Sequence, residues 1–175
     1  LLAFSGGNDS CAAVGILRAQ GYEPTLLTLD MTGDHSLLAR ARRAAEALDA
    51  PLLTIDVRTS FTRRIVDYFA SVYLTGETPA PCTECNSRIK WNTLRDVLAE
   101  RGIGRIATGH YFRLAKQYGK VFVRQAADPA KDQSYYLWGV SQSCLERAIA
   151  PMGETLKREA GETLPAGLKS PESMG

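Results

Sequence analysis

A short apolar run, a loop of small residues and a helical pattern follow one another at the beginning of this sequence. Leu1–Phe4 is apolar, residues 5–10 read Ser-Gly-Gly-Asn-Asp-Ser, and a helical pattern runs from Asp9 to Gln20. This order predicts a buried strand that leads through a tight loop into a helix N-terminus. Such a junction binds phosphate, because glycines let the backbone approach an anion and the N–H groups of the loop and first helical turn point at it.

The alternative is a Gly-rich turn that only caps a core helix. The preceding strand, together with Asp9 and Ser10, favours the phosphate site. The spacing matches neither the Walker A loop nor the dinucleotide-binding fingerprint.

Strand and helix patterns alternate along the rest of the chain. Strands that alternate with helices form a parallel sheet with helices on both faces, so we expect a doubly wound α/β fold. The expected strands are Leu1–Phe4, Thr25–Asp30, Leu52–Asp56 and Ile103–Ala107; the expected helices are 9–20, 36–48, 60–74 capped by Ser60, and 86–100; a hairpin (112–114 with 121–124) and two helices (137–149 and 155–163) follow.

Three polar features fall at the carboxyl ends of the expected strands. They are the loop at residues 5–10, Asp30, and the corner Thr108-Gly109-His110. Ligands of parallel α/β sheets bind at this edge, so the three features predict one site. Gly109 allows a nucleotide to approach the backbone, whereas His110 is either a phosphate or base contact or a structural histidine.

Composition excludes some classes of protein. At 175 residues with 45% apolar residues, the chain suits one globular domain. A net charge of +2 does not by itself indicate a nucleic-acid binder, and we expect the arginines between residues 40 and 64 to form solvated helix faces rather than a phosphate-contacting patch. No apolar run approaches the ~20 residues of a membrane span and no signal peptide is visible, so a cytoplasmic protein without a membrane partner is expected. Four cysteines in that setting indicate a reducing compartment, with Cys11 and Cys144 expected in the core.

The pair Cys82 and Cys85 lies at the end of a loop expected over residues 75–82, just before a helix. Two cysteines at this spacing serve as half of a zinc site, as a redox pair, as cluster ligands or as a nucleophile with a neighbour, and they also occur as buried structural thiols. A zinc site would need a second pair. We favour a reactive thiolate, because the helix start and the cations Arg88 and Lys90 are expected to lower the thiol pKa.

A further polar and aromatic cluster reads Lys-Asp-Gln-Ser-Tyr-Tyr at residues 131–136. It offers a cation, a carboxylate, an amide and two rings, a combination that can stack on and hydrogen-bond an unstacked RNA base. The same residues are equally compatible with a polar helix start.

Four motifs in this order resemble one known family. They are SGGNDS at residues 5–10, PCTECNSRIKW at 81–91, IATGHY at 106–111 and KDQSYYL at 131–137. The chain resembles, over nearly its whole length, the tRNA-specific 2-thiouridylase (MnmA/TrmU) family of PP-loop ATP pyrophosphatases. The resemblance implies an enzyme, a tRNA-uridine 2-sulfurtransferase. It would thiolate the wobble uridine of tRNA by adenylating the uridine C2 oxygen and transferring sulfur through a cysteine relay. ATP, Mg²⁺, tRNA and a persulfide or sulfide donor protein are implied with it.

The resemblance also assigns roles to individual positions. Cys85 matches the family's first catalytic cysteine, and Cys82 is a possible second thiol. The implied ATP-binding positions are Ala3, Phe4, Ser5, Gly6, Gly7, Asn8, Asp9, Ser10, Leu29 and Gly109. The implied tRNA-binding positions are Ala80, Pro81, Cys82, His110, Lys131, Asp132 and Gln133.

Several positions depart from the family pattern. Asn8 replaces the usual Val, Ala80 replaces a frequent Asn, and Cys82 stands where many members carry an Asp considered as an acid/base group. The thiol at Cys82 leaves the general base open and adds an iron–sulfur cluster as an alternative.

The resemblance divides the chain into a PP-loop ATP-binding catalytic domain at residues 1–150 and the start of a linker at 151–175. Residues 172–175 look like the lead-in to the family's second cysteine, so we interpret the sequence as a fragment without the family's C-terminal domains. The alternatives are a PP-loop paralogue that adenylates or thiolates another substrate, and a non-catalytic nucleotide-binding domain of a sulfur-metabolism protein.

Overall fold

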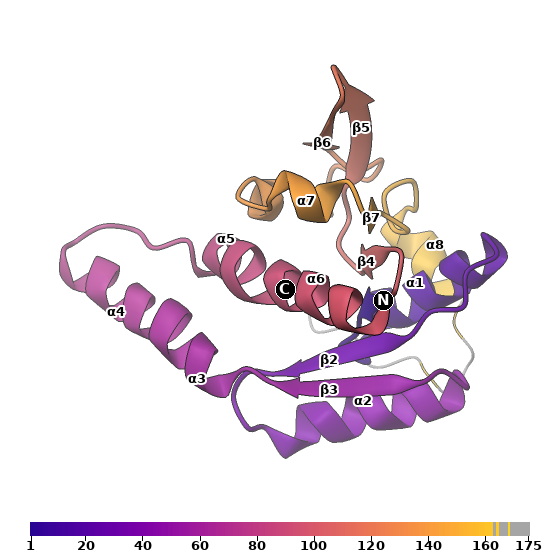
Figure 1. Cartoon of the computed structure of the whole chain (residues 1–175), viewed down its shortest axis with the longest axis horizontal. Helices are drawn as coiled ribbons and strands as arrows, with labels where there is room; N and C mark the ends of the chain where they lie inside the picture. Colours follow the sequence, from indigo (N-terminus) through magenta and orange to yellow (C-terminus); the bar gives the residue numbers. More distant parts are fainter. Residues whose placement is uncertain (163, 165–167, 169–175) are drawn as a thin grey trace.

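The computed structural model describes residues 1–162, 164 and 168, and a five-stranded sheet lies at its centre (Figure 1). The strand order is β3-β2-β1-β4-β7, and each neighbouring pair is parallel. This arrangement confirms the expected doubly wound α/β fold. The strands are β1 (Leu2–Ala3), β2 (Leu26–Asp30), β3 (Leu52–Asp56), β4 (Ile106–Thr108) and β7 (Ala148–Ile149).

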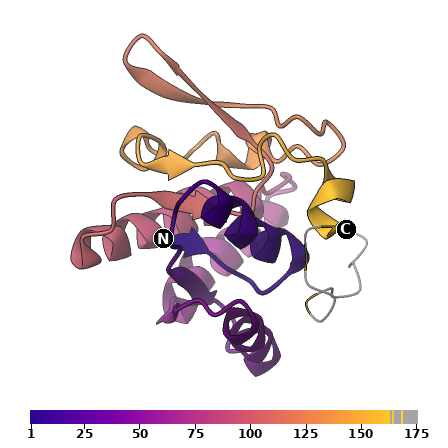
Figure 2. The ribbon, with the colours of Figure 1, turned by 90° about the vertical axis from the view of Figure 1, so that its right-hand side faces the viewer.

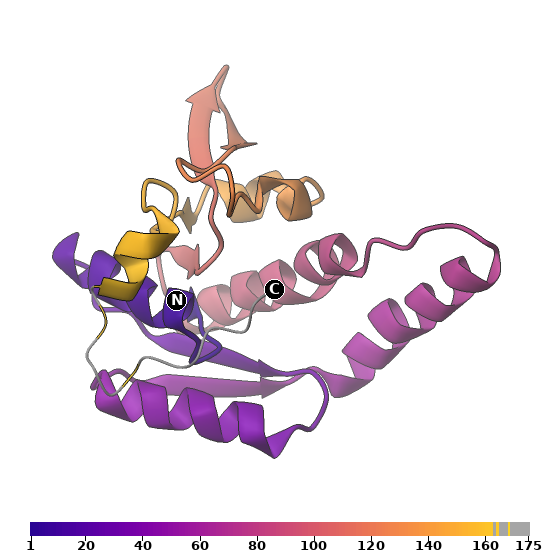
Figure 3. The same ribbon diagram turned by 180° about the vertical axis from the view of Figure 1, so that it is seen from behind.

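Helices cover both faces of the sheet (Figures 1 and 3). Two further strands, β5 (Arg113–Gln117) and β6 (Lys120–Arg124), form the expected antiparallel hairpin, which stands away from the sheet in Figure 2. The helices are α1 (Asn8–Ala19), α2 (His35–Ala47), α3 (Arg58–Phe61), the π-helix η1 (Thr62–Val66), α4 (Asp67–Leu74), α5 (Pro81–Cys85), the π-helix η2 (Asn86–Lys90), α6 (Trp91–Arg101), the 3₁₀-helix η3 (Ser134–Leu137), α7 (Gln142–Leu145) and α8 (Lys157–Glu162).

Alternation along the strands sorts their side chains into two cores. Leu2 and Leu26 pack in a cluster with residues of α1, α2 and α8. Leu1 and Leu27, each one position away, pack in a second cluster with residues of α6 and α7. The helices that follow β1 and β2 therefore cover one face, and those that lead into β4 cover the other.

The helix that leads to β4 begins earlier than expected. It starts at Pro81, in the segment expected as a loop, and runs through α5, η2 and α6 to Arg101. Proline is favoured in the first helical turn because its missing N–H is not needed there. Cys82 and Cys85 consequently lie inside the first turns of this helix rather than before it. Gly102, with φ 65°, ends the helix as expected.

The expected cap at Ser60 is wrong. Ser60 lies inside α3, and the Arg58 N–H donates to Asp56 Oδ1 at 3.0 Å where this helix begins. The carboxylate at the end of β3 therefore supplies the first side-chain acceptor, two residues before the helix starts.

The single helix expected over residues 137–149 is also wrong. η3, α7 and β7 take its place, and Ala148 and Ile149 pair with Ile106 and Ala107 at the edge of the sheet. A segment of two residues is too short to show a strand pattern in the sequence, so pairing with β4 decides the conformation of β7. The last expected helix forms as α8; its expected end at Thr163 lies outside the described residues, as do residues 172–175.

Residues after 150 contribute to the core. Met152 and Ala160 pack in the same cluster as Leu2 and the residues of α1. The division at residue 150 stays a prediction.

The loop between β1 and α1 is held against α2 by a glycine. Gly6 has φ +69°, and a Cβ built on it would lie 2.8 Å from Ala41 Cα. We expect Gly6→Ala to lower the free energy of unfolding through two effects. Overpacking against α2 costs about 1–3 kcal/mol, and the left-handed conformation of a residue with a Cβ costs about 1–2 kcal/mol. Gly21→Ala is the matched control, because Gly21 has φ +83° with open space around it. Denaturant unfolding of both variants measures the difference, and equal losses of stability would show that the contact with α2 is not tight.

Candidate active site

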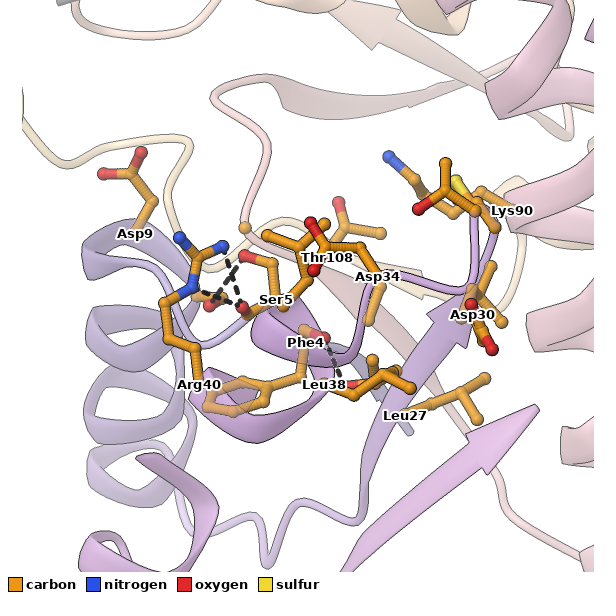
Figure 4. A pocket seen from close by; sticks show the side chains of 18 of the residues that line it. Phe4, Ser5, Asp9, Leu27, Asp30, Asp34, Leu38, Arg40, Lys90 and Thr108 are labelled. Atoms are coloured by element: carbon orange, nitrogen blue, oxygen red, sulfur yellow. Dashed lines mark hydrogen bonds between the residues drawn. The ribbon is translucent and has the colours of Figure 1, made fainter. Parts of the chain in front are cut away.

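A cavity of about 420 Å³ opens at the carboxyl ends of β1, β2 and β4 (Figure 4). The winding of the sheet reverses between β1 and β4, and this switch point is where ligands of doubly wound folds bind. The three polar features expected at this edge all contribute to the wall. Of the residues assigned by resemblance, the lining contains Ala3, Phe4, Ser5, Asp9, Ser10, Leu29, Gly109, His110 and Gln133.

The Ser5–Ser10 loop presents the start of α1 to this cavity. Gly7 precedes the helix with an extended backbone and provides no side-chain cap for it. The Ser10 hydroxyl donates to the Gly7 carbonyl at 2.8 Å, and the Gly7 N–H donates to Ser5 Oγ at 3.3 Å. Because the first turn of a helix directs backbone N–H groups out of its end, this loop suits an anion.

A glycine contact also joins the end of β4 to α1. A Cβ built on Gly109 would lie 3.2 Å from Ser10 N and 3.3 Å from Ser10 Cα. A larger residue at position 109 would push β4 away from the phosphate loop. Gly109 thus has a packing role in addition to the nucleotide contact that the resemblance implies.

Arg40 adds a cation that the sequence did not assign to the site. Its Nε and Nη2 atoms donate to the Ser5 carbonyl, each at 3.3 Å, and its side chain lines the cavity (Figure 4). The arginines between residues 40 and 64 are exposed, as expected, but Arg40 also faces the Ser5–Ser10 loop. An arginine here favours a negatively charged ligand.

Another part of the wall is apolar. Leu29, Met31, Leu38 and Phe61 line it together with Leu27 and Phe4. A cavity that combines cationic and N–H groups with an apolar wall matches a ligand that carries phosphates on an aromatic base.

Asp9 is held by two residues from distant parts of the chain. Its Oδ1 accepts a hydrogen bond from the Tyr111 hydroxyl at 2.8 Å and from Lys157 Nζ at 2.5 Å. Lys157 Nζ also lies 6.0 Å from the centre of the Tyr111 ring. Neither Tyr111 nor Lys157 was assigned to the site from the sequence, and their separation from Asp9 along the chain explains why.

Cys85 does not line the cavity but packs against one of its walls. It is half-buried beside Ile89, in a cluster that also receives Leu29 and Phe61 from the cavity wall. Cys82, one turn earlier, is exposed. The two thiols therefore differ in environment, with Cys85 closer to the apolar wall.

The expected lowering of the thiol pKa is wrong for Cys85. Burial raises its pKa, and the opposing effect of the Lys90 cation is smaller. Arg88, the other cation expected to help, is exposed and forms an ion pair with Glu84 on the same helix. Cys11 and Cys144 are buried as expected, and burial raises the pKa of Cys11 to about 11.

His110 and Lys90 lie where the cavity approaches the helix that carries Cys82 and Cys85. Both line the cavity, and His110 Nδ1 lies 3.0 Å from Thr108 Oγ1. Burial, followed by the charge of Lys90, lowers the pKa of His110 to about 3. The imidazole is therefore neutral at physiological pH when the cavity is empty.

The residues assigned to tRNA lie in two groups. Ala80 and Lys131 are exposed, whereas Gln133 Oε1 accepts the Tyr111 N–H at 3.1 Å and lines the cavity. Asp132 accepts from the Ala126 N–H at 2.8 Å and from the Ser134 hydroxyl at 2.7 Å. Asp132 thus fixes the start of η3, as the alternative of a polar helix start predicted.

Within the described part of the chain, no group of three or more His, Cys, Asp or Glu side chains is arranged to hold a metal ion. A search of the same residues finds no helix with the length and apolar character to cross a membrane.

Known proteins are similar to this chain over most of its length. A sequence model of the family described as tRNA methyl transferase HUP domain matches residues 1–166. Proteins named tRNA-specific 2-thiouridylase MnmA are 42% identical in Phocaeicola vulgatus, 42% in Bacteroides fragilis and 37% in Clostridium botulinum. These alignments cover 93%, 91% and 93% of this chain but 47%, 45% and 49% of the relatives, so the chain spans about half the length of the curated relatives it matches. The resemblance drawn from the four motifs is confirmed.

A solved structure shares the fold at low sequence identity. It is described as a predicted subunit of tRNA methyltransferase from Methanocaldococcus jannaschii, with a TM-score of 0.58 and 18% identity. The match covers 92% of this chain and 71% of that chain, and it supports the fold alone.

The neutral state of His110 has a consequence for stability. Its pKa falls from 6.5 to about 3 on folding, so between these values the unfolded chain binds a proton that the folded chain does not. We expect acid to destabilise the protein through this group as pH falls from 6.5 towards 3. At pH 4.5, His110→Asn should reduce the acid-induced loss of stability, relative to pH 7, by on the order of 2 kcal/mol. Denaturant unfolding at the two pH values measures this, and an unchanged loss would show that His110 titrates normally.

Proposed function

We propose that this chain, which belongs to the tRNA methyl transferase HUP-domain family, binds ATP and uses it for 2-thiolation of a tRNA uridine. The observation that carries the proposal is the cavity at the carboxyl ends of β1, β2 and β4, which joins the α1 N-terminus to an apolar wall. The names of the relatives supply the substrate and the reaction type. Residues 1–150 would form the catalytic domain and residues 151–175 would begin a linker.

ATP fits the shape and chemistry of the cavity. Its volume of about 420 Å³ lies within the ~300–1,000 Å³ typical of small-molecule sites. The loop at residues 5–10 and Arg40 would hold the phosphates. Leu29 and the apolar wall would receive the adenine.

Mg²⁺ fits through Asp9. This ion keeps several waters and usually takes one or two carboxylates together with substrate phosphates, so no larger acidic cluster is needed. Tyr111 and Lys157 fix the orientation of the Asp9 carboxylate at the start of α1. An iron–sulfur cluster fits less well, since Cys82 and Cys85 supply only two ligands and no third is grouped with them among the described residues.

Bound ATP would supply activation, because transfer of AMP to the uridine C2 oxygen with loss of pyrophosphate gives the carbonyl a good leaving group. The residues of this chain would hold the pyrophosphate and exclude water. The loop N–H groups and Arg40 would retain pyrophosphate, and the wall at Leu29 and Phe61 would keep water from the activated carbon.

Sulfur transfer would use Cys85. Its half-buried position, in the cluster that Leu29 and Phe61 of the cavity wall also join, supports this choice over the exposed Cys82. The Cys85 thiolate would attack the cysteine sulfur of a persulfide that originates from a donor protein, forming a disulfide with that cysteine and releasing hydrosulfide. Hydrosulfide would then attack the uridine C2 and expel AMP, in the cytoplasm where thiols stay reduced. Ala80–Cys82, His110, Lys131 and Gln133 would contact the tRNA, whose target base must first leave its stack.

The phosphate role of the loop can be tested without disturbing the fold. A Cβ on Gly7 would meet only Ser5 Oγ at 3.4 Å, an ordinary contact. We expect Gly7→Val to stay folded but to weaken ATP binding at least tenfold, because the side chain fills the space of a phosphate. Gly15→Val, in open space further along α1, is the control. Calorimetry with ATP and Mg²⁺ measures both, and unchanged affinity in Gly7→Val would place the phosphates elsewhere.

The two thiols are expected to differ in importance. Cys85→Ser should abolish formation of 2-thiouridine, whereas Cys82→Ser should only reduce it, because Cys85 alone packs against the cavity wall. Mass spectrometry of nucleosides from unmodified tRNA, treated with the protein, ATP, Mg²⁺ and a persulfide donor, measures the product. Complete loss in both variants, together with bound iron in the parent protein, would instead support a cluster.

A further inference from the structure

Lys90 is a cation that faces the cavity. It lines the cavity on the side opposite Arg40 (Figure 4). Among the residues that the structure describes, its ammonium has neither a hydrogen-bond acceptor nor an ion-pair partner, whereas Arg40, Arg58, Arg88 and Lys157 each have one. Burying a cation without a partner costs free energy, so this position favours an anionic ligand.

The local helix geometry brings Lys90 to the side of Cys85. In a regular α-helix, residues five apart lie about 140° from each other around the axis. Residues 86–90 instead form a π-helix, in which the Trp91 N–H donates to the Asn86 carbonyl. Hydrogen bonding from i to i+5 brings residues five apart towards the same side, and such π segments are frequent at functional sites.

The electrostatics of the two side chains agree with this placement. The Lys90 charge lowers the pKa of Cys85 against the larger effect of burial, and burial lowers the pKa of Lys90 itself. Arg88 lies two residues from Lys90 but is exposed and paired with Glu84. Lys90 therefore acts both on a thiol of its own helix and on the cavity that it lines.

We propose that Lys90 couples the nucleotide cavity to Cys85: its ammonium favours ionisation of the Cys85 thiol when the cavity is empty and pairs with a phosphate oxygen when ATP is bound. The inference rests on the proposed function, in that ATP occupies the cavity. Bound ATP therefore makes Cys85 less nucleophilic while the triphosphate is intact. Lys90 acts on Cys85 again once the triphosphate is cleaved and the loop and Arg40 hold the pyrophosphate, so sulfur transfer follows activation of the base.

The rate at which iodoacetamide alkylates Cys85 tests this coupling. Fragment-ion mass spectrometry separates Cys85 from Cys82. In the parent protein at pH 7.5, saturating ATP should slow Cys85 alkylation several-fold, whereas saturating adenosine, which has no phosphates, should not. Lys90→Met should slow alkylation several-fold without nucleotide, because loss of the cation lowers the thiolate fraction of Cys85, and should remove the dependence on ATP.

Calorimetry on the same proteins separates this inference from the proposed function. Lys90→Met should bind ATP about tenfold more weakly, Lys90→Arg should stay within about threefold of the parent, and the control Arg88→Met should leave ATP affinity and Cys85 alkylation unchanged.

If ATP binds the parent and Lys90→Met equally, or if ATP and adenosine affect Cys85 alike, the coupling is overturned while the nucleotide site stands. If the parent protein does not bind ATP, both proposals are overturned. The comparison of ATP with adenosine uses only the parent protein, so it decides the question even if Lys90→Met does not fold.

Discussion

Two glycine contacts hold the walls of the cavity together, because each brings one backbone against another at a distance that a side chain would forbid. Gly6, at positive φ, lets the loop after β1 lie against α2, and Gly109 lets the end of β4 lie against Ser10 at the start of α1. The first contact puts the Ser5 carbonyl within reach of Arg40. The second sets the corner that carries His110 beside the same helix start. The position of the remaining polar groups around the α1 N-terminus follows from these two contacts.

The sequence allowed the parallel sheet and most of its elements to be predicted, because β1, β2 and β3 are apolar runs bounded by turn residues. β7 was missed, since Ala148 and Ile149 become a strand only by pairing with β4. The early helix start at Pro81 was missed because proline and glycine in that segment favoured a loop. Ser5, Asp9, Ser10 and Leu29 line the cavity as predicted, whereas Gly6, Gly7 and Asn8 do not. Tyr111 and Lys157 were not assigned to the site, because only the folded chain brings them to Asp9.

The cysteine pair shows where local reasoning fails. A helix start and two nearby cations predicted a lowered thiol pKa, yet burial against Ile89 outweighs them for Cys85. The sequence places Arg88 and Lys90 equally close to the thiols, and tertiary structure separates them. Arg88 faces solvent and Glu84, while the π-helical turn at residues 86–90 brings Lys90 to the cavity. The pKa of the Cys85 thiol thus depends first on burial and then on the charge of Lys90.

A crystal structure of this protein with Mg²⁺ and a non-hydrolysable ATP analogue would show whether the carboxyl ends of β1, β2 and β4 form a nucleotide site. We expect phosphate oxygens within hydrogen-bonding distance of the backbone N–H groups at residues 6–10, with the adenine against Leu29. A nucleotide bound outside this cavity, or bound with its phosphates away from the start of α1, would contradict it.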